Sequence, residues 1–218
     1  MKSIFTILIV TISAFAVNIH SHFGIKGSGE IVTKEKNSTQ NFIKVSSDLS
    51  ANMVIKSSNH NYIKVQTDKN IIDKITLYIK HNTLFVSAND SIAPTKLNII
   101  IGMVDLQEIR AYGALDIKTK NFKIDNLLLD INGASTLNFY NTKIKTLYIK
   151  ADGTFNVFFK RDSIAENTYI DADGAGDLIL NIKKFLKLKV SGAISIKYSG
   201  SPKIEKDIDG VANITKLK

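Results

Sequence analysis

The chain has 218 residues, a formal net charge of +9 at neutral pH and no cysteine. This length is sufficient for one domain with a sizeable hydrophobic core, and the lack of cysteine excludes a disulfide framework and a lipid-modified cysteine. The basic balance favours anionic partners such as acidic glycans, lipopolysaccharide phosphates or an anionic membrane surface.

Residues 1–16 have the pattern of a secretory signal peptide. Lys2 is followed by an apolar run from Ile4 to Ile12 and by Ala14-Phe15-Ala16, a small-x-small cleavage site. The run is too short to span a bilayer, although an uncleaved anchor is the alternative. We therefore expect an exported protein, periplasmic, on the cell surface or secreted, with no transmembrane segment after cleavage. Export and the lack of a binding motif make nucleic acid an unexpected partner.

We interpret residues 17–40 as an N-terminal linker or a first edge, because the chain is polar and irregular from Gly27 to about Asn41. Residues 41–105 predict less regular strands, beginning with a degenerate coil over 42–47 in which Ser47 takes the place of a glycine. Residues 75–80 and 84–88, separated by the turn His81-Asn82, predict a hairpin, and 97–103 predict a strand. No linker follows, so residues 41–218 are assigned to a single domain.

From about Leu106 onward, a glycine recurs every 18 to 21 residues. The row comprises Gly113, Gly133, Gly153, Gly174, Gly192 and Gly210. Residues four and two before each glycine, and four after it, are apolar with the exception of Lys206, and polar residues stand between them. A fixed period of this length indicates a stacked-repeat architecture.

Each repeat predicts two strands that meet at a glycine corner. Alternation with a period of two marks a half-buried strand, and a polar residue followed by glycine provides the positive φ that a sharp corner needs. A second, looser connection, such as 160–167 or 181–185, closes the repeat. Because such repeats are too short for a crossover helix and parallel crossovers are right-handed, we predict an all-β fold. It is a right-handed parallel β-helix with coils of 18–21 residues.

The residues three positions before the glycines alternate strictly in the sign of their charge. This row is Arg110, Asp130, Lys150, Asp171, Lys189 and Asp207. In stacked coils each member has opposite charges above and below it, and a slipped register is disfavoured even though an exposed pair contributes only about 0.2–1 kcal/mol. The row predicts an alternating ladder on the outside of the β-helix; the alternative is a chance pattern.

Several ordered motifs carry a resemblance to a known family. They are Phe42-Ile43-Lys44-Val45, the segment from Asp68 to Ile75, Thr83-Leu84-Phe85-Val86, the glycine motifs and the closing segment from Tyr198 to Ile204. Over roughly residues 41–214 the chain resembles the putative autotransporter adhesin head GIN domain, a domain of unknown function. The resemblance implies a β-helical fold, no conserved catalytic residues and a suggested role in adhesion. Only Asp173-Gly174-Ala175-Gly176-Asp177 keeps the two glycines and the aspartate of the usual repeat.

The acidic turn around Gly174 is the one candidate cation site. Asp171, Asp173 and Asp177 offer carboxylates of the kind that Ca²⁺ prefers, but their spacing differs from that of calcium-binding repeats, so we interpret them as turn residues. The four histidines lie outside the regular coils, and no nucleophile elbow is present. We therefore expect no catalytic residue, no cofactor and no metal.

The second connection of each repeat is rich in cations. The candidate ligand-binding residues of this basic edge are Lys143, Lys145, Lys160, Arg161, Lys183 and Lys184. Stacking aligns them along one side of the rod as a positive strip suited to an extended polyanion. The alternative is that these cations keep exposed β-structure soluble and prevent edge pairing.

The sequence thus predicts an exported, non-enzymatic, adhesin-like domain that binds an anionic polysaccharide or envelope component. One alternative is a polysaccharide lyase-like enzyme, which needs clustered carboxylates with Ca²⁺ and a basic residue on one strand face; Arg110 and Arg161 are the only arginines in the chain. Another alternative is a structural or sensing module of the cell envelope with a protein partner.

Overall fold

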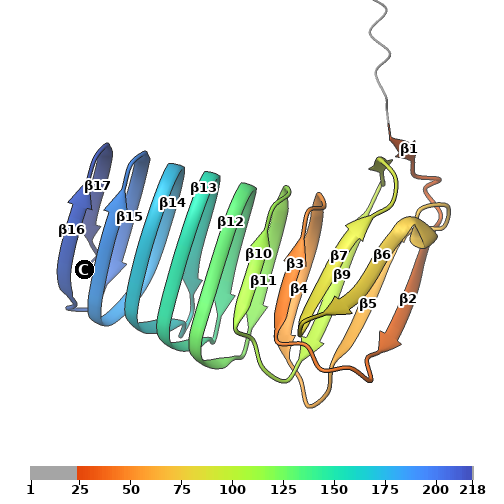
Figure 1. The fold of residues 1–218 in the computed structure, drawn as a ribbon, viewed down its shortest axis with the longest axis horizontal. Helices are drawn as coiled ribbons and strands as arrows, with labels where there is room; N and C mark the ends of the chain where they lie inside the picture. The colour runs from red at the N-terminus through yellow and green to blue at the C-terminus, as the bar shows by residue number, and fades with distance from the viewer. Residues whose placement is uncertain (1–23, 218) are drawn as a thin grey trace, which may run out of the picture.

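The computed structural model describes residues 24–217, which wind into an elongated β-helix (Figure 1). From residue 108 onward the coils lie side by side in chain order, whereas residues 44–57 lie between the coil that begins at residue 108 and residues 83–103. The predicted signal peptide lies outside the described residues. The N-terminal part comprises β1 (Ile25–Lys26), β2 (Ile31–Asn37), β3 (Lys44–Ser47), β4 (Ala51–Ser57), β5 (Tyr62–Asp68), the 3₁₀ turn η1 (Ile72–Lys74), β6 (Ile75–Lys80), β7 (Thr83–Ala88), β8 (Ile92–Ala93) and β9 (Leu97–Met103). The regular coils comprise β10 (Glu108–Ala111), β11 (Leu115–Lys120), β12 (Lys123–Tyr140), β13 (Lys143–Lys160), β14 (Ile164–Val190), β15 (Ala193–Ser199), β16 (Lys203–Ile208) and β17 (Val211–Lys216).

Equivalent residues of successive coils lie directly above one another, as the repeat predicts. Strands β12, β13 and β14 pair in parallel so that Gly133, Gly153 and Gly174 are aligned. The apolar residues that alternate along each strand point inward and are buried; Leu129 and Ile149 are two of them. The predicted stacking of glycine-marked coils into a β-helix is confirmed, and its core is one continuous column of aliphatic and aromatic side chains.

The glycine corner brings the backbones of neighbouring coils into close contact. Gly174 has a φ of 145°, and a Cβ atom built on it would lie only 2.2 Å from the carbonyl oxygen of Gly153. Both the conformation and the lack of space require glycine at this position. The recurrence of glycine in the sequence therefore follows from the stacking of one corner upon another.

The second connection is tighter than the sequence predicts. Asn121 and Asn141 adopt left-handed conformations with φ values of 64° and 49°, which asparagine tolerates better than most residues. The side-chain amide of Asn141 donates to Oδ1 of Asn121 at 3.2 Å. Pairing resumes two residues after this bend, and β14 continues without interruption through residues 181–185, where a loop was expected.

The first coil has a register that differs from the predicted one by two residues. Val45 pairs with Ile109 and Ser47 with Ala111, so Ser47 occupies a strand position and Leu49 lies beneath Gly113. A Cβ atom on Gly113 would be 2.1 Å from the carbonyl oxygen of Leu49. The prediction was wrong because a leucine, which gives no turn signal, stands at this corner.

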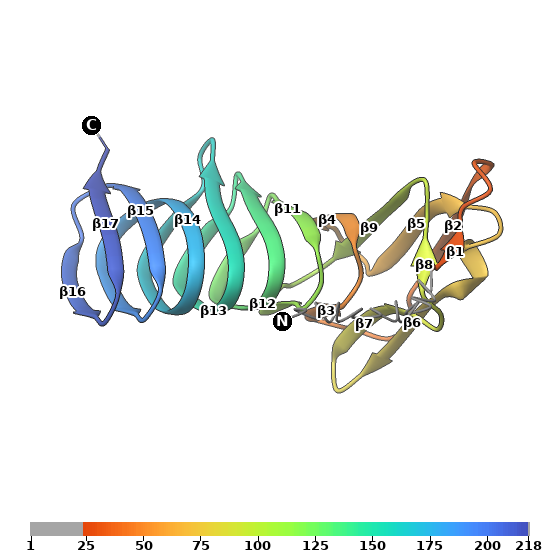
Figure 2. The ribbon, with the colours of Figure 1, turned by 90° about the horizontal axis from the view of Figure 1, so that it is seen from above.

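The N-terminal end departs from parallel stacking. β6 and β7 form the predicted antiparallel hairpin, while β2 pairs antiparallel with β5 at the end of the sheet order. Of the two interpretations of residues 17–40, the structure shows an edge strand for residues 31–37. Figure 2 shows β2 and β5 on one side of this end and β6 and β7 on the other.

The buried carboxylate of Asp68 fixes the segments around β2. It accepts hydrogen bonds from the backbone N–H of Gly29 at 2.7 Å and from the backbone N–H and hydroxyl of Thr95 at 2.8 and 2.7 Å. Burial alone raises the pKa of Asp68, but these hydrogen bonds favour the charged form and leave its pKa below the ordinary value.

The last coil carries a charge in an otherwise apolar inward row. Lys206 of β16 pairs with Leu188 of β14, which is fully buried. Among the described residues β16 has no strand on its other side, and a charged side chain at an inward position discourages edge-to-edge pairing. The one exception to the apolar pattern is therefore located where the stack ends. Within residues 24–217, no helix has the length and apolarity needed to cross a membrane.

Candidate functional site

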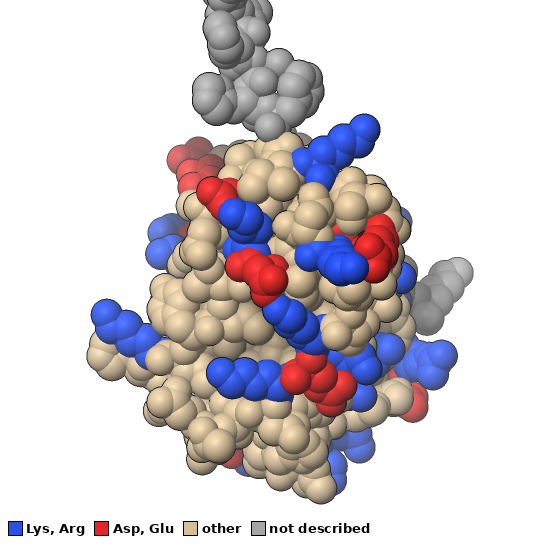
Figure 3. Space-filling view, turned by 90° about the vertical axis from the view of Figure 1, so that its right-hand side faces the viewer, with Lys and Arg blue, Asp and Glu red and all other residues tan. Residues whose placement is uncertain are grey.

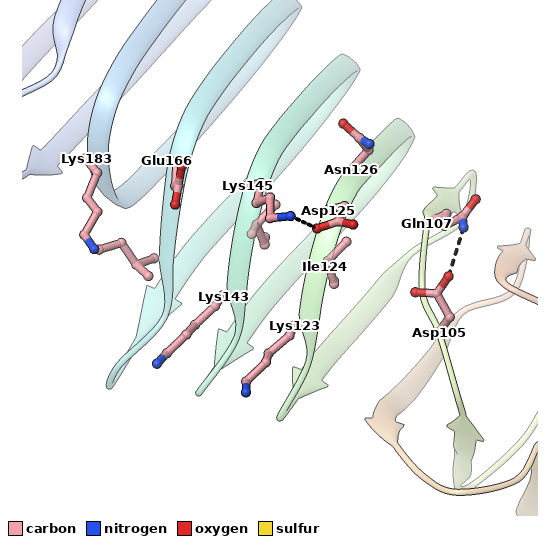
Figure 4. Close-up of a pocket in the computed structure, with 12 residues that line it drawn as sticks. Asp105, Gln107, Lys123, Ile124, Asp125, Asn126, Lys143, Lys145, Glu166 and Lys183 are labelled. Atoms are coloured by element: carbon pink, nitrogen blue, oxygen red, sulfur yellow. Dashed lines mark hydrogen bonds and ion pairs between the residues drawn. The ribbon is translucent and has the colours of Figure 1, made fainter.

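Part of the predicted basic edge lines a groove of about 540 Å³ on the side of the regular coils (Figure 4). Its basic residues are Lys123, Lys143, Lys145 and Lys183. Lys123 and Lys143 are aligned on neighbouring strands, which places their backbones about 4.8 Å apart. Both side chains extend in the same direction in Figure 4. Three of the six predicted site residues are thus brought together, and Lys123 joins them.

Acidic residues divide this edge, so the positive strip is not continuous. Asp125 forms an ion pair with Lys145 at 2.5 Å, and Glu166 forms one with Lys184 at 2.7 Å. The hydrogen bond and charge of Asp125 raise the pKa of Lys145, whereas the hydrogen bond and charge of Lys184 lower the pKa of Glu166.

These four residues form a second row of alternating charge, which the sequence reasoning missed. Asp125, Lys145, Glu166 and Lys184 each precede a glycine of the repeat by eight positions. Asp105 stands eight positions before Gly113 and repeats the sign of Asp125, so the alternation is visible in the sequence from Asp125 to Lys184. Its effect is that Lys145 and Lys184, both predicted ligand-binding residues, already have acidic partners.

The remaining lysines of the groove have no such partner. Among the described residues, no carboxylate lies within 4.0 Å of the ammonium group of Lys123, Lys143 or Lys183. Asp105, at one end of the groove, accepts a hydrogen bond from the side-chain amide of Gln107 at 2.9 Å. After the ion pairs are subtracted, the groove keeps three cations and one anion.

The other three predicted residues do not line the groove: Lys184 pairs with Glu166, and Lys160 and Arg161 lie at the preceding bend. Lys160 ends β13 and places its ammonium group 4.8 Å from the centre of the Phe158 ring, a cation–π contact. Arg161 follows it in a left-handed conformation with a φ of 52°. The chain turns between these residues and the strand that borders the groove.

The predicted alternating ladder is present in the register of the strands. Arg110 is aligned with Asp130, Asp130 with Lys150, and Lys150 with Asp171. Within this row, an ion pair forms between Lys189 and Asp171 at 3.7 Å.

Two members of the ladder instead bind groups outside it. Arg110 Nε donates to the buried carboxylate of Glu108 at 2.5 Å, and Lys44 contacts the same carboxylate at 3.0 Å. Asp130 accepts a hydrogen bond from the hydroxyl of Tyr112 at 2.8 Å. The ladder therefore aligns opposite charges on neighbouring coils, but most of its members do not form ion pairs with one another.

The acidic turn does not gather its carboxylates. Asp171 and Asp173 border one depression, whereas Asp177 borders another, with Asn156 and Ser195. Over residues 24–217, no three histidine, aspartate or glutamate side chains are close enough together to hold a metal ion.

The fold is similar to that of several crystal structures. One is described as "a putative adhesin" from Bacteroides fragilis NCTC 9343, with a TM-score of 0.74 and 24% identity over 89% of this chain and 100% of that one. A second, described as "putative lipid binding protein", is from Parabacteroides distasonis ATCC 8503, with a TM-score of 0.61 and 17% identity over 89% and 99% of the two chains. A third, "a putative adhesin" from Parabacteroides merdae ATCC 43184, has a TM-score of 0.59 and 18% identity over the same shares.

At these identities the similarity concerns the fold. No curated protein matches the chain. The glycine-cornered coils and the motifs that precede them do match a family model, described as "Putative auto-transporter adhesin, head GIN domain", over residues 41–202. Since this match spans more than half of the sequence, the chain belongs to that family.

Proposed function

We propose that this protein is an exported, non-enzymatic, adhesin-like β-helix that binds an anionic polysaccharide or envelope component. The observation that carries the proposal is the groove with three lysines, Lys123, Lys143 and Lys183, that lack acidic partners among the described residues. The predicted signal peptide and the name of the family support a location outside the cytoplasm.

The geometry of the groove suits an extended polymer. It runs across neighbouring coils: Lys123 and Lys143 are aligned one coil apart, about 4.8 Å, and Lys183 belongs to a later coil. A flexible lysine binds an anion as a point charge without the fixed fork of arginine. Such a surface selects for charge density along a chain more than for one particular sugar ring.

A binding role also agrees with the state of the carboxylates in the groove. Asp125 and Glu166 each form an ion pair with a lysine. Such a pair keeps the carboxylate ionised and occupied by the lysine ammonium group. A lyase requires a carboxylate cluster free to take a cation and a base directed at the substrate.

The proposal is tested by binding of polygalacturonate at low and high salt, with neutral dextran as the control polymer. We expect the triple variant Lys123→Gln, Lys143→Gln, Lys183→Gln to lose binding on the order of tenfold, since each exposed charge contributes about 0.2–1 kcal/mol. A matched variant replaces three exposed lysines elsewhere, Lys80, Lys96 and Lys197, with the same change in net charge.

Equal loss in both variants would show that net charge alone attracts the polymer. Binding that is unaffected by salt or equal for dextran would contradict an electrostatic site. Formation of unsaturated products from the polygalacturonate would overturn the non-enzymatic assignment in favour of a lyase.

A further inference from the structure

The N-terminal end of the β-helix is open between two edge strands. Among the described strands, β2 pairs with β5 alone and β6 pairs with β7 alone. The two strands belong to opposite sides of the coil, as Figure 2 shows. The hydrophobic core therefore reaches the end of the molecule between them.

The opening between β2 and β6, which we call the N-terminal mouth, has an apolar floor. Ile63 and Val65 of β5 are buried, while Ile75 and Leu77 of β6 belong to the inward face of the hairpin and remain partly exposed. Together with Ile72 they line a hollow of about 470 Å³. This volume falls within the range of about 300–1,000 Å³ that is typical of small-molecule sites.

Two lysines stand on the inward face of β2, where an apolar residue is expected. In the antiparallel pairing Lys34 is opposite Val65 and Lys36 is opposite Ile63, and directly opposite residues share one face of a sheet. Lys34 forms an ion pair with Asp73 across the mouth. Over residues 24–217, Lys36 has no carboxylate within 4.0 Å.

The surface around the mouth mixes charge with apolar area. Figure 3 looks onto this end and shows blue and red side chains interspersed over a tan surface. The ion pairs at this end include Lys64 with Glu35 at 3.3 Å and Lys69 with Glu30 at 3.0 Å. Lys64 and Glu35 are opposite each other in the antiparallel pairing, one residue out of phase with Lys36, and Glu35 also borders the hollow.

We propose that the N-terminal mouth binds an anionic single-chain amphiphile. Its acyl chain lies against Ile63, Val65 and Leu77, and its head group binds the ammonium group of Lys36, with Lys34 beside it. An apolar floor beneath one unpaired cation, Lys36, is complementary to a ligand with a hydrocarbon tail and one negative end. This site is separate from the lysine groove and goes beyond the proposed polymer binding.

The contribution of the acyl chain to binding is tested by calorimetry of the full mature chain. The ligands are saturated alkyl carboxylates of 8, 10 and 12 carbons, each below its micelle concentration. Each pair of added methylenes should tighten binding by about tenfold, because a buried methylene contributes about 0.8 kcal/mol. Affinity that does not depend on chain length would overturn the proposal. Dodecyl phosphate in place of dodecanoate identifies the preferred head group, and tight binding of either one supports the site.

Single-lysine variants test the head group. Lys36→Gln should weaken dodecanoate several-fold and leave the neutral alcohol dodecanol unchanged, whereas the matched variant Lys64→Gln, one residue out of phase in the same strand pair, should bind as the native protein does. Equal affinities in the two variants would mean that Lys36 only protects the edge strand from pairing and would refute the site.

Two further variants separate the site from folding and from the groove. Leu77→Asp places a like charge on the floor and should abolish dodecanoate binding, with circular dichroism and thermal melting as checks on the fold. The triple lysine variant of the groove should retain full affinity for dodecanoate. Retained binding in Leu77→Asp would overturn the assignment of the mouth, whichever result the polymer experiment gives.

Discussion

Replacing Gly174 by alanine should destabilise the β-helix by two separable effects. The added methyl group would lie 2.2 Å from the carbonyl oxygen and 2.8 Å from the nitrogen of Gly153, and both are backbone atoms that move only with their coil. Overpacking of this kind costs about 1–3 kcal/mol. The φ of 145° adds conformational strain of about 1–3 kcal/mol. For a chain of this size, about 2–4 °C is lost per kcal/mol, so we expect the melting temperature to fall by about 5–20 °C.

Two other glycines separate these effects. At Gly192 the methyl group would be 1.9 Å from the carbonyl oxygen of Gly174, but φ lies outside the left-handed region, so only crowding acts. At Gly29 φ is 81°, and a Cβ atom built there would have no atom of a non-neighbouring residue within 4 Å. Only backbone strain would therefore destabilise the alanine variant. Thermal unfolding followed by circular dichroism should rank Gly174→Ala as the most destabilised of the three. A native melting temperature in Gly192→Ala would refute the argument that close stacking of corners requires glycine.

Two further changes test buried polar groups. The hydroxyl of Thr168 is buried without a hydrogen-bond partner among the described residues, so Thr168→Val should stabilise by about 1 kcal/mol. The matched change Thr142→Val removes a hydroxyl that donates to the carbonyl of Tyr140 at 3.0 Å and should destabilise; the same sign for both in urea unfolding would contradict this reasoning. Because the pKa of Asp68 in the folded state lies below its ordinary value of 3.8, its contribution to stability is complete above about pH 4 and is lost as the pH falls through the folded-state pKa. Asp68→Asn should therefore flatten the decline of the melting temperature below pH 4, and parallel pH profiles would show that another group controls acid unfolding.

The regular coils were predictable because stacking repeats one physical requirement at a fixed interval. Crowding at the corner selects glycine, burial selects an apolar residue such as Leu129 or Ile149, and alignment of charge selects opposite signs at Asp130 and Lys150. Each requirement recurs in most of the coils, so the pattern is visible without a structure.

The first corner, the antiparallel pairing of β2 and the pairing of the groove lysines were not predicted from the sequence. Leu49 holds a corner position without a turn residue, and the antiparallel β2 occurs once. The candidate groove was only partly predictable, because the lysines of the second connection stand out in the sequence whereas their pairing with Asp125 and Glu166 depends on the stacking of the coils. A surface is defined by the neighbours of a residue, and composition by itself does not show which cations are already neutralised.

The alternation of sign along the coils has a consequence for how such a chain lengthens or shortens. Between residues 125 and 189 both charged rows change sign from coil to coil, so within these coils the unit that preserves electrostatic complementarity is a pair of coils. Loss of a single coil, for example residues 134–153, would bring Asp130 next to Asp171 and Asp125 next to Glu166. Within these coils, duplication or deletion of an even number of coils leaves both rows intact, whereas an odd number aligns like charges in both rows at once.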